Sequence, residues 1–140
     1  MPTPEYSQKP LYQKLGLKTG DTLKLINAPN NYPEILSETP ENIQYIPETD
    51  TLTQVNIIHF FPQSIEDYEI QINNLKNQIL PNGTIWVSWD KTKSKLPHQL
   101  NENIIRDTAL ALGLVDVKVC SVSDTWSGLK LVWRKENRKV

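Results

Sequence analysis

Tryptophan and aspartate residues come together at two places in the chain where a small molecule could be held. Trp89 and Asp90 end one apolar run, and Asp124 and Trp126 precede another. Indole rings offer flat walls for stacking and carboxylates offer polar contacts, so this combination favours a ligand pocket. The alternative is that the rings seal the top of a sheet while Asp124 anchors its turn by hydrogen bonds, and sealing is the commoner role of buried aromatic residues.

Residues that usually perform acid–base, nucleophilic or metal chemistry are few and scattered. His59 lies inside an apolar run, which predicts a neutral, hydrogen-bonded core histidine rather than a general base. Cys120 lies in the middle of a predicted strand, so we expect an unreactive thiol. His59 and His98 lack clustered cysteine or carboxylate ligands, and no metal site is predicted. The basic loop of residues 91–98 could bind an anion or close as a lid, although a solvated loop is the commoner case.

Length and composition predict one ordinary globular domain. The chain has 140 residues, of which 38% are hydrophobic and 22% charged, and its formal net charge is −1. This length allows one domain over residues 1–140, whose residues 1–8 we expect to be flexible. The small net charge argues against binding to nucleic acid or to an anionic membrane. A single cysteine, with no apolar signal or membrane-spanning segment, predicts a cytoplasmic location.

Predicted strands and helices alternate along the chain. Apolar runs predict strands at residues 22–28, 43–46, 55–61, 83–89, 115–123 and 126–135. The clearest helix begins after Ser64, a good N-cap, keeps one apolar stripe through Ile79 and ends at the turn of residues 81–83. Glu102 and Arg106 on a later helix predict a surface ion pair, with Arg106 reaching a ligand site as the alternative. The last two strands are joined by a turn too short for a crossover, so they should be antiparallel. We therefore predict an α/β fold: a single three-layer Rossmann-like domain with a mostly parallel sheet ending in an antiparallel hairpin.

Local blocks of sequence resemble a known superfamily. Residues 15–25, LGLKTGDTLKL, resemble the entry to the first strand of class I S-adenosylmethionine-dependent methyltransferases, and residues 80–87, LPNGTIWV, are similar to their helix-to-strand passage. A closer resemblance, to a bacterial domain-of-unknown-function family (number 3052), lies in blocks at residues 15–17, 25–29, 86–89, 113–120 and 125–132. This resemblance implies a methyltransferase-like fold, and it implies no established activity.

The strand order of methyltransferases implies which residues meet in space. Open parallel sheets bind ligands beyond the carboxyl ends of their strands, near the point where strand order reverses. By analogy, the last strand should insert beside residues 83–89, which places its first residues next to Trp89 and Asp90. The candidate ligand-binding residues at this edge are Asn27, Asn30, Phe61, Gln63, Trp89, Asp90, Lys91, Asp124, Trp126 and Ser127. No residue is assigned a catalytic or metal-binding role.

The turn after the first strand lacks the glycines that a nucleotide cofactor usually requires. Glycine allows positive φ and removes the Cβ that would collide with the cofactor. Here Ala28 carries a Cβ, and Pro29 fixes φ and removes an N–H donor. Asn30 or Asn31 could still adopt left-handed φ, and Glu48 is a loose candidate for the carboxylate that holds a ribose. We therefore expect no conventional binding of S-adenosylmethionine and no other cofactor.

The sequence favours a small cytoplasmic domain that lacks standard methyltransferase activity and binds an unidentified small molecule or protein partner. The alternative is a small-molecule methyltransferase that holds S-adenosylmethionine with a non-glycine loop, in which Asp90 or Asp124 would orient the substrate. A third hypothesis is a subunit that binds a partner through an exposed sheet edge or through its tryptophan-lined edge.

Overall fold

The computed structural model describes residues 9–138. The expected flexibility of residues 1–8 lies outside the described residues. The elements follow in the order α1 (Leu11–Leu15), β1 (Thr22–Ile26), α2 (Tyr32–Leu36), β2 (Gln44–Tyr45), β3 (Val55–Phe60), α3 (Ile65–Leu75), η2 (Lys76–Gln78), β4 (Ile79–Asp90), α4 (Glu102–Ala111), β5 (Leu114–Ser121), β6 (Trp126–Trp133) and η3 (Lys135–Asn137), where η marks a 3₁₀ turn.

The six strands of the described residues form one sheet in the order β2-β1-β3-β4-β6-β5. Strands β2, β1, β3 and β4 are parallel to one another, β6 is antiparallel to β4, and β5 is antiparallel to β6. The predicted α/β fold, with a mostly parallel sheet and a closing antiparallel hairpin, is therefore confirmed. Strand β3 lies at the centre, as its nearly continuous apolar sequence predicts for a strand covered on both faces.

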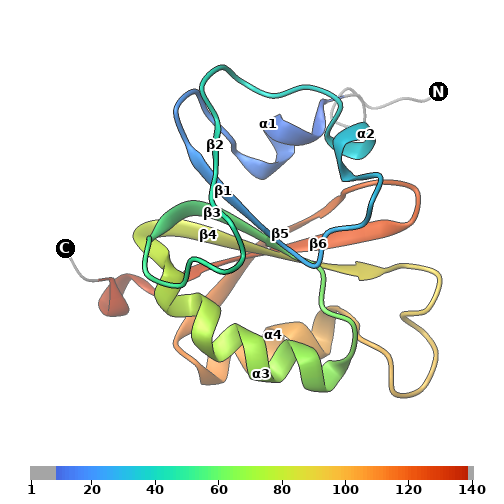
Figure 1. Cartoon of the computed structure of the whole chain (residues 1–140). Helices are drawn as coiled ribbons and strands as arrows, with labels where there is room; N and C mark the ends of the chain where they lie inside the picture. The colour runs from blue at the N-terminus through green and yellow to red at the C-terminus, as the bar shows by residue number, and fades with distance from the viewer. Residues whose placement is uncertain (1–8, 139–140) are drawn as a thin grey trace.

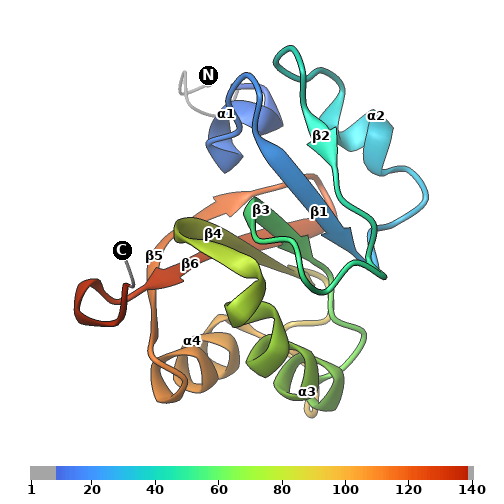
Figure 2. The same cartoon turned by 60° about the vertical axis from the view of Figure 1, so that its left-hand side comes forward.

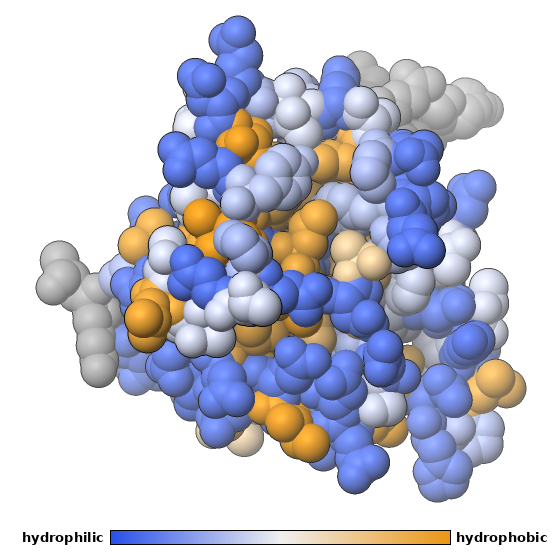
Figure 3. All heavy atoms as spheres, viewed as in Figure 1, coloured by the Kyte–Doolittle hydropathy of each residue, from blue (hydrophilic) through white to orange (hydrophobic). Residues whose placement is uncertain are grey.

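Helices cover both faces of the sheet, α1 and α2 on one face and α3 and α4 on the other (Figures 1 and 2). Consecutive residues of β3 serve the two cores, because Ile57 packs with Leu15 and Tyr32 while Ile58 packs with Tyr68 and Ile105. Hydrophilic residues occupy much of the outer face seen in Figure 3. None of the helices in residues 9–138 has the length and apolar character that crossing a membrane requires.

Helix α3 ends earlier than its apolar spacing predicts. The helix stops at Leu75, the 3₁₀ turn η2 follows, and Ile79 opens β4 by pairing with Val55. The prediction that the helix continues through Ile79 to residues 81–83 is wrong. A buried isoleucine fits the last turn of a helix and the first position of a buried strand equally well, and only pairing with β3 decides between them. Gly83 accommodates the irregular start of β4, because a Cβ there would lie 3.0 Å from the Cβ of Ile79.

Replacing Ser64 by alanine should lower the free energy of unfolding by about 1 kcal/mol. The hydroxyl of Ser64 accepts a hydrogen bond from the backbone N–H of Asp67 at 3.0 Å and so caps the first turn of α3. Urea unfolding of the variant measures the loss. Ser64→Asp is the matched control, because aspartate keeps the accepting oxygen, and equal losses in the two variants would contradict the cap as the cause.

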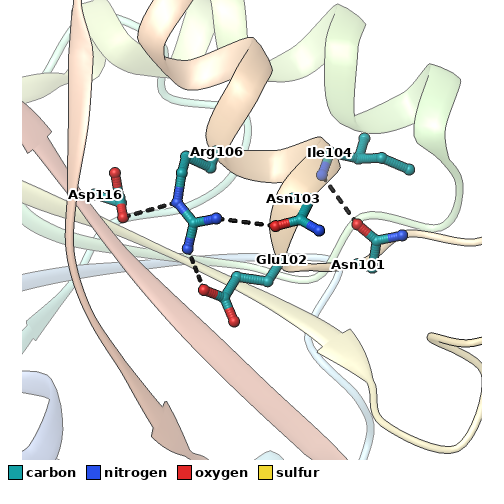
Figure 4. A network of polar contacts seen from close by, with 6 residues as sticks. All are labelled: Asn101, Glu102, Asn103, Ile104, Arg106 and Asp116. Atoms are coloured by element: carbon teal, nitrogen blue, oxygen red, sulfur yellow. Dashed lines mark hydrogen bonds and ion pairs between the residues drawn. The ribbon is translucent and has the colours of Figure 1, made fainter.

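Arg106 joins α4 to β5 (Figure 4). Its Nε donates to the carboxylate of Asp116 at 2.9 Å, one terminal nitrogen donates to Asn103 at 3.0 Å, and the other pairs with Glu102. The predicted Glu102–Arg106 pair is confirmed. Each of the three guanidinium nitrogens has a partner in this network, so the alternative in which Arg106 reaches a ligand site is not realised in the structure.

Candidate functional site

An open cavity of about 460 Å³ lies at the carboxyl ends of β1, β3 and β4, and we call it the rim cavity. Its lining residues are Asn27, Ala28, Pro29, Asn30, Phe61, Pro62, Gln63, Ser64, Trp89, Asp90, Lys93, Gln99, Leu100 and Trp126. The chain passes from β1 outward to β2 and then returns across β1 to β3, so strand order reverses beside this cavity. Open α/β sheets characteristically bind ligands at such a point.

Most of the predicted ligand-binding residues meet at the rim cavity. The predicted residues that line it are Asn27, Asn30, Phe61, Gln63, Trp89, Asp90 and Trp126. The strand register explains part of this meeting, because Asp90 of β4 lies directly opposite Trp126 of β6. That these residues bind a ligand stays a prediction.

Three predicted residues lie elsewhere. Lys91 turns toward β5, where its Nζ donates to the hydroxyl of Ser121 at 3.0 Å. Ser127 lines a separate cavity beside β5. Asp124 is exposed. The role expected of it as a turn anchor belongs to Ser123, whose hydroxyl accepts hydrogen bonds from the backbone N–H groups of Thr125 and Trp126, both at 3.2 Å.

The loop after β4 contributes lining residues that the sequence did not place. Lys93, Gln99 and Leu100 face the rim cavity, although only the basic character of this loop was evident beforehand. Asp90 organises the start of the loop, because its carboxylate accepts from the N–H of Thr92 at 2.9 Å and from the hydroxyl of Thr92 at 2.6 Å. These hydrogen bonds, the side-chain one foremost, lower the pKa of Asp90 below its ordinary value.

The turn after β1 contains a residue with left-handed backbone that is not a glycine. Asn27 has a φ of 58°, whereas the sequence had suggested Asn30 or Asn31 for this conformation. Its side-chain nitrogen donates to the carbonyl of Phe61 at 2.7 Å, and its side-chain oxygen accepts from Gln63 at 3.3 Å. Asparagine tolerates positive φ better than other side chains do. Its carboxamide therefore ties the end of β1 to the residues that follow β3.

Aromatic rings form the inner wall of the rim cavity. Phe61 is buried, and the ring of Trp126 meets it edge-on with centroids 5.1 Å apart. Beneath it, His59 stacks on Phe61 at 4.4 Å and Tyr32 meets both rings edge-on. Trp89 is only 7% exposed, so it mainly seals the sheet, whereas Trp126 is half-buried and presents more of its surface.

Comparison with solved structures finds this fold in proteins of remote sequence. A candidate type 11 methyltransferase from Sulfolobus solfataricus aligns with a TM-score of 0.63 at 13% identity, over 99% of this chain and 96% of that chain. A TehB-like S-adenosylmethionine-dependent methyltransferase from Corynebacterium glutamicum aligns with a TM-score of 0.58 at 7% identity, over 89% and 85%. The fold of this chain is methyltransferase-like.

A third methyltransferase-like relative has its cofactor bound. Magnesium protoporphyrin IX methyltransferase from Synechocystis PCC 6803 with bound S-adenosylmethionine aligns with a TM-score of 0.55 at 11% identity, over 89% of this chain and 74% of that chain. At these identities the likeness shows the fold alone. No protein-family model matches the sequence, and no curated protein matches it.

Within the methyltransferase-like fold, His59 belongs to a buried network rather than to the rim cavity. Its Nδ1 is 2.8 Å from the hydroxyl of Tyr32, and its Nε2 is 2.7 Å from the hydroxyl of Ser88. All three side chains are buried, and none lines the rim cavity. Burial lowers the pKa of His59 to about 3, so the ring is neutral. The prediction of a hydrogen-bonded core histidine is confirmed, and its serine partner Ser88 was not foreseen.

Lys24 is a buried cation in β1, and the apolar pattern of this strand did not predict its burial. Its side chain is fully buried, and its Nζ donates to Gln78 at 2.6 Å and to the carbonyl of Asp50. Burial lowers the pKa of Lys24, while the carboxylates of Asp50 and Glu48 act in the opposite direction. The lysine thereby connects the segment between β2 and β3 to η2, the turn that follows α3.

Glu48, the candidate ribose carboxylate, lies beside Lys24 instead of at the rim cavity. It lines a different cavity of about 510 Å³, together with Lys24 and residues of α3. In residues 9–138 no group of three or more His, Cys, Asp or Glu side chains could hold a metal ion. The rim cavity thus combines aromatic walls, side-chain amides, one lysine and the carboxylate of Asp90, without a carboxylate from the end of β2.

Proposed function

We propose that this chain is a Rossmann-like domain that binds a small ligand in the rim cavity and lacks standard methyltransferase activity. The observation that supports this most directly is the turn after β1. Asn27 takes the left-handed position there, and its carboxamide is already bonded to Phe61 and Gln63. Two expectations from the sequence belong to the same proposal. Five blocks of sequence resemble a bacterial family without established activity, and the single cysteine indicates a cytoplasmic location.

S-adenosylmethionine is the cofactor that the fold implies, and the residues present fit it poorly. A nucleotide packs closely on the main chain when glycines line the turn. In this chain the side chain of Asn27 occupies the turn, Ala28 adds a Cβ, and Pro29 lacks an N–H donor. Glu48, the acidic residue that could hold a ribose, faces the cavity beside Lys24. We therefore assign no residue to methyl transfer.

The lining of the rim cavity favours a planar ligand with hydrogen-bonding groups. Phe61 and Trp126 supply aromatic surface, and carboxamides of Asn30, Gln63 and Gln99 supply donors and acceptors around it. The first turn of α3 carries Glu66 and Asp67, which oppose the attraction of the helix N-terminus for an anion. A neutral ligand suits this balance better than a phosphorylated one.

Calorimetric titration with S-adenosylmethionine and with S-adenosylhomocysteine should give no binding heat. The turn is the expected cause, so the double variant Asn27→Gly, Pro29→Gly should bind more of either compound than the matched control Asn30→Gly. Native mass spectrometry of protein purified without added ligand should reveal extra mass, which Trp126→Ala should remove. Micromolar affinity of the natural chain for either compound would overturn the proposal.

The alternative function is a small-molecule methyltransferase with a non-glycine cofactor loop. The observation that favours it is the S-adenosylmethionine bound to a relative of the same fold. Under this alternative Asp90, which lines the rim cavity, is the better placed of the two candidate substrate-orienting carboxylates. A tryptophan at position 27 or 30 should then abolish both cofactor binding and turnover, whereas under our proposal it should displace only the unidentified ligand.

The third candidate function is binding of a protein partner. The partner would contact the free edge of β5 or the residues around the rim cavity. Light scattering coupled to size exclusion, followed by pull-down with the purified chain, separates this version from small-ligand binding. A strict monomer without a captured partner would leave the small-ligand version alone.

A further inference from the structure

A further cavity, of about 470 Å³, lies between α1 and β5, and we call it the lysine cavity. Its lining residues are Lys9, Gln13, Lys14, Lys118, Val119, Cys120, Ser121 and Ser127. It shares no lining residue with the rim cavity. What it binds is therefore independent of the function proposed for the rim.

Ammonium groups from separate parts of the chain converge on this cavity. Lys14 of α1 donates to the carbonyl of Ser121 at 3.1 Å, and Lys91 from the loop after β4 donates to the hydroxyl of the same residue at 3.0 Å. Lys118 lines the cavity from β5 and lies directly opposite Lys130 of β6. Like charges directly opposite each other on neighbouring strands are destabilising, so the closeness of these two lysines lowers the stability of the fold.

Among the described residues, no acidic side chain forms an ion pair with these lysines. In residues 9–138 the ion pairs within 4.0 Å are those of Arg106 with Glu102 and with Asp116. Burial lowers the pKa of Lys130, and the positive charges of Lys118 and Lys18 lower it further. The chain as a whole has a net charge of −1, so this positive region is a local feature of the fold. A bound anion would relieve the repulsion.

The lining also indicates the kind of anion. Lysines are compact point charges that suit phosphate, and no arginine offers a planar fork for a carboxylate here. The hydroxyl of Ser127 and the amide of Gln13 can donate to phosphate oxygens. Within residues 9–138 no aromatic ring lines the cavity, whereas proteins that bind single-stranded nucleic acid stack bases on such rings. We propose that the lysine cavity binds a small molecule carrying two or more phosphate charges, held chiefly by Lys14 and Lys118.

Calorimetric titration of the full chain with inorganic pyrophosphate at low salt tests this proposal. Wild type should bind, and Lys14→Gln and Lys118→Gln should each weaken binding about tenfold, since each removes a charge-assisted hydrogen bond. Lys95→Gln is the matched control, because it removes the same charge from the exposed loop outside the cavity and should leave the affinity unchanged. Binding should weaken as salt is raised.

Thermal unfolding of each variant tests whether weaker pyrophosphate binding results from loss of the folded structure. Lys118→Gln is the safer variant, because Lys118 is exposed. Absence of pyrophosphate binding by wild type would overturn the proposal, and so would equal weakening by Lys95→Gln, which would indicate a general charge effect. A single-stranded oligonucleotide that binds more tightly than pyrophosphate, and loses that affinity in the two cavity variants, would replace the small ligand with a nucleic acid.

Discussion

Replacing Trp86 by alanine should lower the free energy of unfolding by about 3–5 kcal/mol. The indole is fully buried in the core between the sheet and α1 and α2. Its Nε1 donates to the carbonyl of Leu15 at 3.0 Å and so attaches the end of α1 to β4. Alanine would leave a large cavity and an unpaired carbonyl, and both effects destabilise the folded state.

Urea unfolding measures this loss, and Trp86→Phe separates its two causes. Phenylalanine keeps much of the buried apolar area and removes the N–H donor, so its effect should fall between those of wild type and Trp86→Ala. The site leaves little room to collapse, because a Cβ on Gly128 would already lie 3.2 Å from the indole. A loss below about 1 kcal/mol in Trp86→Ala would contradict the packing described here.

The free energy of unfolding should fall as pH decreases below about 6.5, with His59 contributing about 1 kcal/mol per pH unit. In the folded chain burial lowers the pKa of His59 to about 3, from an ordinary value of 6.5. Below pH 6.5 the unfolded chain binds a proton that the folded chain does not, so protonation favours unfolding. The contribution of His59 is fully present above pH 6.5 and is lost progressively toward pH 3, which amounts to several kcal/mol in total.

Measurement between pH 5 and 6.5 isolates the histidine, because most carboxylates stay ionised over this interval. The slope of unfolding free energy against pH should decrease in His59→Gln and remain in His98→Gln, which changes an exposed histidine. If His59→Gln does not fold, the imidazole resonances of wild type supply the test. A His59 ring that becomes protonated above pH 5 in the folded chain would contradict the buried network with Tyr32 and Ser88.

Several elements could be predicted from the sequence because their signals are local. The apolar run of β3 indicated a strand covered on both faces, and Ser64 marked the start of α3 through a cap that depends on neighbouring residues. The short turn after β5 required an antiparallel hairpin of β5 and β6, whereas the pairing of β6 with β4 places Trp126 opposite Asp90. The meeting of Trp89, Asp90 and Trp126 at one edge followed from these signals and from the strand order of a resembling superfamily.

Other features depend on contacts between residues far apart in the sequence, and local patterns do not contain them. The end of α3 is set by pairing between Ile79 and Val55. Lys24 is buried because Gln78 and the carbonyl of Asp50 meet its ammonium group, although its position in β1 reads as part of an apolar strand. Lys91 and Ser127 follow the predicted rim residues in sequence but turn toward β5.

The sequence by itself determined the layer order and the type of each long element, since periodicity, caps and turn lengths act over a few residues. The edge at which the predicted ligand-binding residues gather followed from the strand order of the resembling superfamily. Only the tertiary structure decided that Asn27 takes the left-handed turn and that His59 finds Ser88. It also decided that Lys93 lines the rim cavity while Lys91 turns toward β5. Each of these outcomes depends on which side chains meet after the sheet has closed, and that meeting is a property of strand register and packing rather than of any local pattern.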